Sequence, residues 1–196
     1  MKRRGMLLVV SAPSGAGKTT IVKEILKAYP TFGFSVSATT RKKRHGEVDG
    51  KDYFFLSRNE FERKIAAGDL VEHEEIYSNY YGTLKSEVEK ALSNGQDIVF
   101  DVDVNGGLSI KARFQEALLI FIKPPSIEAL RKRLKGRGSE SDEQIERRMA
   151  RVEMELEKGE GFDYIIINDE LKRAVNEVFG IIDKKRKELS SGTETD

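Results

Sequence analysis

The sequence predicts an α/β fold in which a central parallel sheet is covered by helices on both faces. Four short, largely apolar segments predict the sheet: residues 6–10, 98–103, 118–122 and 164–167. Such segments are typical of strands that are buried on both faces. Segments with the 3.6-residue period of helices lie between them, and this alternation favours a parallel sheet. The 196 residues suit one domain with insertions.

The composition excludes several other classes of protein. With 34% charged and 38% hydrophobic residues, the chain has the balance of a soluble globular protein rather than a disordered one. It contains no cysteine, which excludes disulfides, thiol nucleophiles and thiolate metal sites. A formal net charge of +1 gives no long-range field that would favour nucleic acid or a membrane surface. No apolar run approaches the ~18 residues of a membrane helix. We therefore expect a cytoplasmic protein that binds neither nucleic acid nor membrane.

The first apolar segment leads into a glycine-rich loop, residues 11–20, which a helical pattern follows. This order is the context of a P-loop, which binds the phosphates of a nucleoside triphosphate. Glycines at 15 and 17 let successive N–H groups point at one phosphate cluster. Lys18 would reach the β- and γ-phosphates, and the Thr19 hydroxyl would bind Mg²⁺. The predicted triphosphate-binding residues are Ala12, Pro13, Ser14, Gly15, Ala16, Gly17, Lys18, Thr19 and Thr20.

The loop departs from the pattern G-x-x-x-x-G-K-[ST] at its first position, where Ala12 replaces glycine. Ala12 must then keep a negative φ, which alanine does readily. The alternative is a plain Gly/Ser turn, but strand, glycines, Lys-Thr-Thr and helix all occur in the order that a P-loop requires. The motif alone does not distinguish a kinase from a GTPase or a motor protein.

The stretch between the first helix and residue 98 has a mixed pattern. Arg41 and Arg44 lie in a basic loop after Thr-Thr, and their spacing near a phosphate motif favours anion binding over a solvated surface. The strand around Glu72 has no wholly apolar face, so we expect it to line a cleft or to lie at a sheet edge. The expected elements are strands over 34–38, 53–56 and 69–77, a helix over 57–67 opened by a capping box, a turn over 78–83, and a helix to 94 capped by Thr83.

The second half of the chain supplies a carboxylate and a group of arginines. Asp101 ends an apolar strand, which is the Walker-B pattern for holding or orienting Mg²⁺; its alternative as a strand-end cap is weaker once a P-loop is present. Two helices, 126–134 and 141–159, are joined by Gly136-Arg137-Gly138 and are rich in arginine. They have the character of a mobile lid, although an exposed, salt-bridged hairpin would give the same pattern.

Several of these stretches together resemble the guanylate kinases, a family of nucleoside monophosphate kinases. The resemblance covers about residues 6–184 and implies ATP + GMP ⇌ ADP + GDP with Mg²⁺. It also implies a P-loop three-layer fold with a small mixed α/β GMP-binding insertion and a helical lid. It rests on the P-loop, Ser37-Ala38-Thr39-Thr40-Arg41, Gly46-Glu47 through Asp52-Tyr53, Asn79-Tyr80-Tyr81-Gly82, Asp101-Val102-Asp103, Gly136-Arg137-Gly138 and Asn168-Asp169.

The resemblance divides the single domain, 1–196, into parts. The core would comprise 1–34, 95–125 and 162–190. Residues 35–94 would form the GMP-binding subdomain and 126–161 the lid, and we expect a disordered tail over 190–196.

The resemblance also assigns roles to residues. Glu72 would accept the N1–H and N2–H₂ donors of guanine, with Asp103 assisting and with hydroxyls from Ser37 and Thr83. Adenine presents an acceptor at N1, so AMP would leave a buried charge unpaired and be rejected. The remaining GMP-binding residues would be Arg41, Arg44, Tyr53, Tyr81 and Asp101; the metal ligands Thr19 and Asp101; the catalytic residues Lys18, Arg41, Arg133, Arg137 and Arg148; and the contacts to ATP outside the loop Arg133, Arg137 and Asn168.

Three rival readings and one departure remain. A guanylate-kinase-like scaffold that binds peptides would have lost the P-loop and arginine residues, which this chain keeps. A regulatory GTPase would need Asn-Lys-x-Asp, which Asn168-Asp169 is not. Glu72 and Asp103 argue against a kinase for another monophosphate. Asn105 stands where relatives often carry glutamine, which leaves its contact in doubt. The oligomeric state, monomer or homodimer, stays open.

Overall fold

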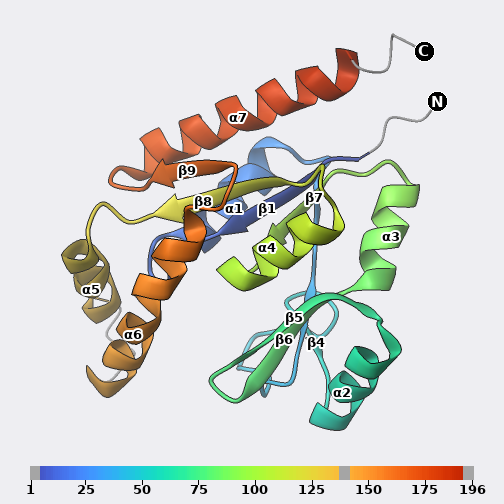
Figure 1. Cartoon of the computed structure of the whole chain (residues 1–196), viewed down its shortest axis with the longest axis horizontal. Coiled ribbons are helices and arrows are strands. Elements are labelled where there is room, and N and C mark those ends of the chain that lie inside the picture. Colours follow the sequence, from blue (N-terminus) through green and yellow to red (C-terminus); the bar gives the residue numbers. More distant parts are fainter. Residues whose placement is uncertain (1–4, 137–141, 192–196) are drawn as a thin grey trace.

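The computed structural model describes residues 5–136 and 142–191 and contains two sheets joined by helices (Figure 1). The larger sheet is entirely parallel, with strand order β2-β7-β1-β8-β9. The smaller sheet is mixed, with order β4-β3-β6-β5. The strands of the larger sheet are β1 (Leu7–Ser11), β2 (Gly33–Phe34), β7 (Ile98–Asp101), β8 (Leu118–Lys123) and β9 (Tyr164–Ile167).

The larger sheet is buried on both faces, as its apolar sequence predicts. Leu8 and Val10 pack with α1 (Lys18–Ala28) and α7 (Leu171–Ser191) on one face, while Leu7 and Val9 pack with α4 (Val104–Arg113) on the other. This alternation follows from the two-residue period of a strand. The predicted three-layer α/β fold with a central parallel sheet is confirmed.

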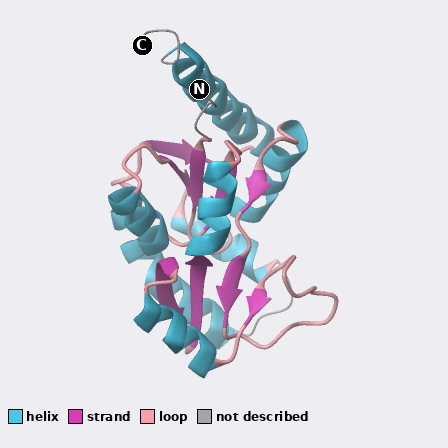
Figure 2. Cartoon of the chain, turned by 90° about the vertical axis from the view of Figure 1, so that its right-hand side faces the viewer, coloured by secondary structure: helices cyan, strands magenta, loops and turns pink. Residues whose placement is uncertain are grey.

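The smaller sheet and its helix lie below the larger sheet in both cartoon views (Figures 1 and 2). It has a core of its own, in which Phe61 of α2 packs against Ala38, Leu70 and Leu84. Its elements are β3 (Ser37–Thr39), β4 (Phe54–Phe55), α2 (Arg58–Ala67), β5 (Leu70–Ile76) and β6 (Asn79–Leu84), and α3 (Lys85–Ser93) leads back to β7. The predicted capping box is present at Ser57 and Glu60, and β5 lies at the sheet edge as expected.

Three local predictions are wrong. The segment 34–38 is two strands, because the chain passes from the larger sheet to the smaller one at Ser35 and Val36. The segment 78–83 is a strand, since the turn is confined to Tyr77 and Ser78; Thr83 lies within β6 and caps no helix. Helix α7 continues through residues 190 and 191 of the predicted tail, and their hydroxyls donate to main-chain oxygens one turn earlier.

Two helices lie beside the carboxyl edge of the larger sheet. They are α5 (Ile127–Lys135), capped by the Ser126 hydroxyl, and α6 (Asp142–Gly159). Leu130 and Leu134 of α5, with Met149 of α6, reach the core beside α1.

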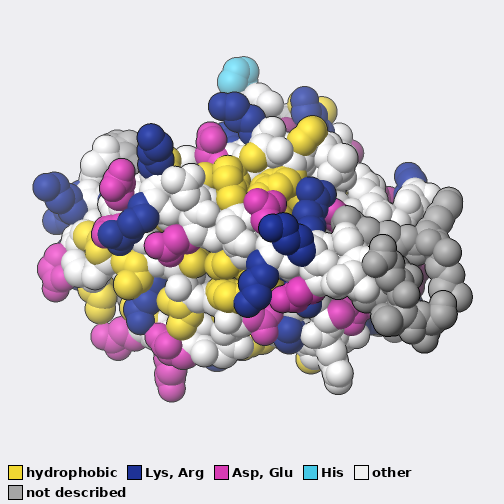
Figure 3. Space-filling model, turned by 90° about the horizontal axis from the view of Figure 1, so that it is seen from above, with side chains coloured by type: hydrophobic (Ala, Val, Ile, Leu, Met, Phe, Trp, Pro, Cys, Tyr) yellow, Lys and Arg dark blue, Asp and Glu magenta, His cyan; other side chains and the backbone are white. Residues whose placement is uncertain are grey.

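In the described ranges 5–136 and 142–191, no helix is both long and apolar enough to cross a bilayer. Seen from above, basic and acidic side chains are interspersed on the surface (Figure 3).

Candidate active site

The glycine-rich loop has the backbone of a phosphate-binding loop. Gly15 and Gly17 have φ values of 92° and 100°, which favour glycine, and Gly17 begins α1. A side chain at Gly17 would also place a Cβ 2.3 Å from Asn168 Nδ2. Ala12, which replaces the first glycine of the motif, does not have a positive φ, as predicted for alanine at this position. The loop therefore turns its N–H groups toward the start of a helix, where the helix dipole attracts anions.

Asn168 holds this loop against the ends of β8 and β9. Its side chain is only 5% exposed and donates to Ala16 O at 2.7 Å, while its main-chain N–H donates to Lys123 O. Arg133 of α5 donates to Asn168 O at 2.8 Å. In this structure both residues brace the loop, and neither lines the cleft in front of it.

A cleft of about 360 Å³ lies in front of the loop; we call it the donor cleft. Arg148 of α6 enters it and donates to Ser14 Oγ at 2.6 Å. Tyr77, from the turn between β5 and β6, also lines it. Its lining comprises the predicted loop residues except Ala16, together with Arg44, Ile76, Tyr77, Tyr81, Asp103, Arg148, Arg151 and Glu155.

Lys18 lies at the centre of the site. Its Nζ is 2.6 Å from Asp101 Oδ1 and donates to Val102 O at 2.8 Å. Asp101 reaches this position because β7 pairs with β1, which puts Asp101 beside Val10 at the entrance to the loop. The positive charge of Lys18 is thus already paired by the predicted Walker-B carboxylate.

A second cavity of about 190 Å³, the acceptor pocket, adjoins the donor cleft. Lys18, Ile76, Tyr81 and Asp103 line both spaces. The remaining lining residues of the acceptor pocket are Ser37, Tyr53, Glu72, Glu74, Gly82, Asp101 and Val102. The structure therefore brings six predicted GMP-binding residues together with the predicted P-loop lysine: Ser37, Tyr53, Glu72, Tyr81, Asp101 and Asp103.

Glu72 is a buried carboxyl in the wall of the acceptor pocket. Burial raises its pKa to about 7, against the opposing effect of the Thr83 hydroxyl, which donates to Oε1 at 2.7 Å. The other oxygen, Oε2, lies close to the backbone of Gly106, where an added Cβ would approach to 2.8 Å. Thr83 itself does not line the pocket, so its place here is to hold Glu72.

Glu74 and Asp103 form a second pair of carboxyls beside Glu72. Burial and a hydrogen bond with Glu74 raise the pKa of Asp103 to about 8. Burial alone would raise the pKa of Glu74, but hydrogen bonds from Asp103, Asn105 and Arg151 outweigh it and lower that pKa. We infer that the two carboxyls share one proton, which explains why Glu74 Oε2 and Asp103 Oδ2 are buried without another hydrogen-bond partner.

Two of the predicted arginines, Arg41 and Arg133, line neither space. Arg41 makes a two-pronged ion pair with Glu47 and lies over the ring of Tyr53, so that it is next to the acceptor pocket but does not line it. Arg137 lies outside the described residues. Conversely, sequence reasoning missed Glu74, Arg151 and Glu155. Only Glu74 gave a signal, because it shares a strand face with Glu72.

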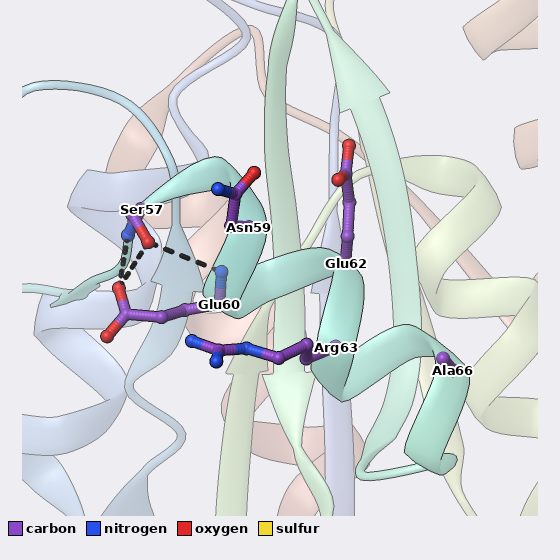
Figure 4. Close-up of a pocket in the computed structure, with 6 residues that line it drawn as sticks. All are labelled: Ser57, Asn59, Glu60, Glu62, Arg63 and Ala66. Atoms are coloured by element: carbon purple, nitrogen blue, oxygen red, sulfur yellow. Dashed lines mark hydrogen bonds between the residues drawn. The ribbon is translucent and has the colours of Figure 1, made fainter.

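An open hollow on the outer side of α2 is a weaker candidate. Two of its polar residues are already paired, since Ser57 donates from both N and Oγ to Glu60 Oε2 (Figure 4). It contains none of the predicted site residues; its lining is Ser57, Asn59, Glu60, Glu62, Arg63 and Ala66.

Comparisons with known proteins agree with this geometry. The family model described as guanylate kinase matches residues 4–185. A guanylate kinase of Symbiobacterium thermophilum is 47% identical over 181 residues, which are 92% of this chain and 86% of the relative. One of Chlorobium chlorochromatii is 50% identical over 175 residues, 89% and 92% of the two chains. The crystal structure of guanylate kinase from Anaplasma phagocytophilum superposes with a TM-score of 0.76 at 30% identity and covers 94% of this chain and 88% of that one. The chain that carries this P-loop cleft and carboxyl-lined pocket therefore belongs to the guanylate kinase family.

Proposed function

We propose that this guanylate kinase transfers the γ-phosphoryl group of ATP to GMP, or to dGMP, where the donor cleft and the acceptor pocket meet. The observation that carries the proposal is their shared wall. Lys18, Tyr81 and Asp103 line both spaces, so two bound nucleotides would face each other across these residues. Such an arrangement converts a reaction between two solutes into one between groups held in place.

On the donor side, the loop N–H groups and the N-terminus of α1 would bind the ATP phosphates. Lys18 would exchange part of its contact with Asp101 for the β- and γ-phosphates. No cluster of three or more metal-ligating side chains occurs within residues 5–136 and 142–191. Mg²⁺ bound with a nucleotide takes one or two protein ligands and completes its shell with phosphates and water. Thr19 and Asp101 would hold the ion, which would help to neutralise the charge of the reacting phosphates.

On the acceptor side, Glu72 would read the base. Its ionised carboxylate accepts both N1–H and N2–H₂ of guanine, while Ser37 faces O6 and Asp103 assists. Arg44, Tyr53 and Tyr81 would hold the GMP phosphate, together with Arg41 once it leaves Glu47. A charged acceptor discriminates strongly against adenine, because adenine would leave that charge unpaired in a buried pocket.

The transfer itself needs little acid–base chemistry, since the attacking phosphate oxygen is ionised near neutral pH. Catalysis is positioning and charge stabilisation. Arg148 already reaches the loop, and with Arg133 and Arg137 it would neutralise the equatorial oxygens in transfer. Closure of α5 and α6 would exclude the water that otherwise hydrolyses ATP. We expect this reaction in the cytoplasm, with the two nucleotides as the only partners that it requires.

A coupled assay of ADP release tests the proposal. With ATP and Mg²⁺, GMP and dGMP should support turnover, and AMP, CMP and UMP should not. Equal turnover with AMP would overturn the guanine assignment. A protein that releases no ADP with any monophosphate would instead fit the peptide-binding scaffold, which no observation favours because Lys18, Thr19 and Arg148 are in place.

A further inference from the structure

Arg151 of α6 occupies the border between the two nucleotide spaces. Its guanidinium is 3.1 Å from Glu74 Oε1, 3.5 Å from Asp103 Oδ2 and 3.5 Å from Glu155 Oε1. The side chain is 21% exposed, so that these contacts are only partly screened by water. One arginine of the helical pair therefore joins a strand of the smaller sheet to the N-cap of α4, just after β7.

The carboxyls around Arg151 need this positive charge. Glu72, Glu74 and Asp103 line one small pocket, and burial raises the pKa of the neighbouring Glu155. Lys18 is already engaged by Asp101. Even with one proton shared between Glu74 and Asp103, the remaining negative charges repel at such short range, and without a cation the carboxyls would turn apart or take up further protons.

Further contacts fix the partner of Arg151. Asn105 of α4 donates to the same oxygen, Glu74 Oε1, at 2.9 Å, and Lys158 of α6 donates to Asn105 Oδ1 at 2.6 Å. Arg151 also lies 5.9 Å from the ring centre of Tyr77, at the tip of the β5–β6 hairpin. Side chains from α6 thus reach Glu74 directly through Arg151 and indirectly through Lys158 and Asn105. This gives Asn105, whose contact the sequence left in doubt, a place in the network.

We propose that Arg151 is a positioning residue for the acceptor nucleotide: from α6 it fixes Glu74 and Asp103 in the wall of the acceptor pocket. The proposal rests on the proposed function. Arg148 and Arg151, three residues apart on α6, then have different roles. Arg148 contacts the donor loop, and Arg151 contacts the acceptor wall. Movement of α6 and the shape of the guanine pocket are then linked.

Kinetics of Arg151→Ala test this role. Loss of the guanidinium should raise KM for GMP by about tenfold or more, since the Glu74–Asp103 carboxyl pair in the pocket wall loses its cationic partner. KM for ATP should rise less than KM for GMP, because Arg151 lines the donor cleft but its ion pairs are with Glu74, Asp103 and Glu155 rather than with the loop. Arg151→Lys keeps a charge without the planar fork and should give an intermediate KM for GMP. Arg147→Ala is the matched control, since Arg147 is 67% exposed and pairs with Glu143 on its own helix.

A double-mutant cycle with Glu74→Ala separates positioning from general loss of structure. If Arg151 acts through Glu74, the double variant should have nearly the KM for GMP of Arg151→Ala alone. Effects that multiply independently, a KM for GMP within about twofold of wild type, or an equal rise in KM for ATP would each overturn the proposal. A wild-type protein without GMP-dependent ADP release would sink the proposed function instead, so the two failures are distinguishable.

Discussion

The protonation of Glu72 should limit the capture of GMP below neutral pH. Burial raises its pKa from the usual 4.5 to about 7 in the empty pocket. That change corresponds to about 3 kcal/mol in favour of the neutral carboxyl. Guanine offers two donors here, so only the ionised form can accept both. The free protein must therefore lose this proton before GMP binds well.

The expected result is a fall in kcat/KM for GMP of about tenfold per pH unit below about pH 7, because kcat/KM reports groups of the free enzyme. The KM for ATP should not show this pH dependence, which we call the Glu72 limb of the profile. The GMP phosphate titrates near pH 6, about one unit lower, so the two limbs are separable. The assay is ADP release at saturating ATP between pH 5.5 and about 8.5.

Two variants make the pH prediction specific to Glu72. Glu72→Gln cannot titrate and should lose the upper limb along with about 2–4 kcal/mol in kcat/KM for GMP, as one acceptor becomes a donor. AMP should gain relative to GMP. Thr83→Val removes a hydrogen bond that lowers the Glu72 pKa, so its limb should move to higher pH. A wild-type profile that is flat from pH 6 to about 8 would refute the reasoning.

Three further outcomes are expected. Lys18→Ala should keep the far-UV circular dichroism of the wild type but cut kcat/KM by roughly 10³-fold, about 4 kcal/mol, and wild-type turnover would exclude Lys18 from the reaction. Gly106→Ala should raise KM for GMP and spare KM for ATP, because its Cβ would come 2.8 Å from Glu72 Oε2; unchanged GMP kinetics would count against the tight fit. Ser78 has a φ of 64°. In urea unfolding, Ser78→Gly should stabilise by up to about 1 kcal/mol and Ser78→Val should destabilise, and the opposite order would show that the turn is unstrained.

The sequence was sufficient for the parts of the fold that depend on local chemistry. Continuous apolar segments identified the buried strands, and Ser57 and Ser126 marked helix starts. The loop was recognisable because phosphates demand particular groups, whereas the acceptor carboxyls Glu72 and Asp103 were assigned through the resemblance to a known family. Glu72 lies where the prediction put it, in a cleft and on an edge strand.

What the sequence could not predict depends on tertiary placement. A hairpin turn with positive φ usually contains glycine or asparagine, which the sequence would show. Here Tyr77 and Ser78 occupy the positive-φ positions, so the turn was not recognised and β6 was missed. The strand at 34–38 is interrupted because the chain changes sheets there. Arg151 is one arginine among many on a charged helix, and no local pattern shows that it meets Glu74 across the fold.

The separate core of the smaller sheet has a consequence for how the molecule responds to temperature. Ala38, Phe61, Leu70 and Leu84 form a cluster distinct from the two large clusters that flank the central sheet. A small cluster buries less apolar area, so this unit should open and exchange its amide hydrogens at lower free energy than the strands beneath the P-loop. Substitutions in these four positions would then tune how readily the acceptor wall forms, while the phosphate-binding frame keeps its rigidity. Substitutions at these positions could therefore adapt the protein to a colder or hotter habitat without changing the phosphate-binding residues.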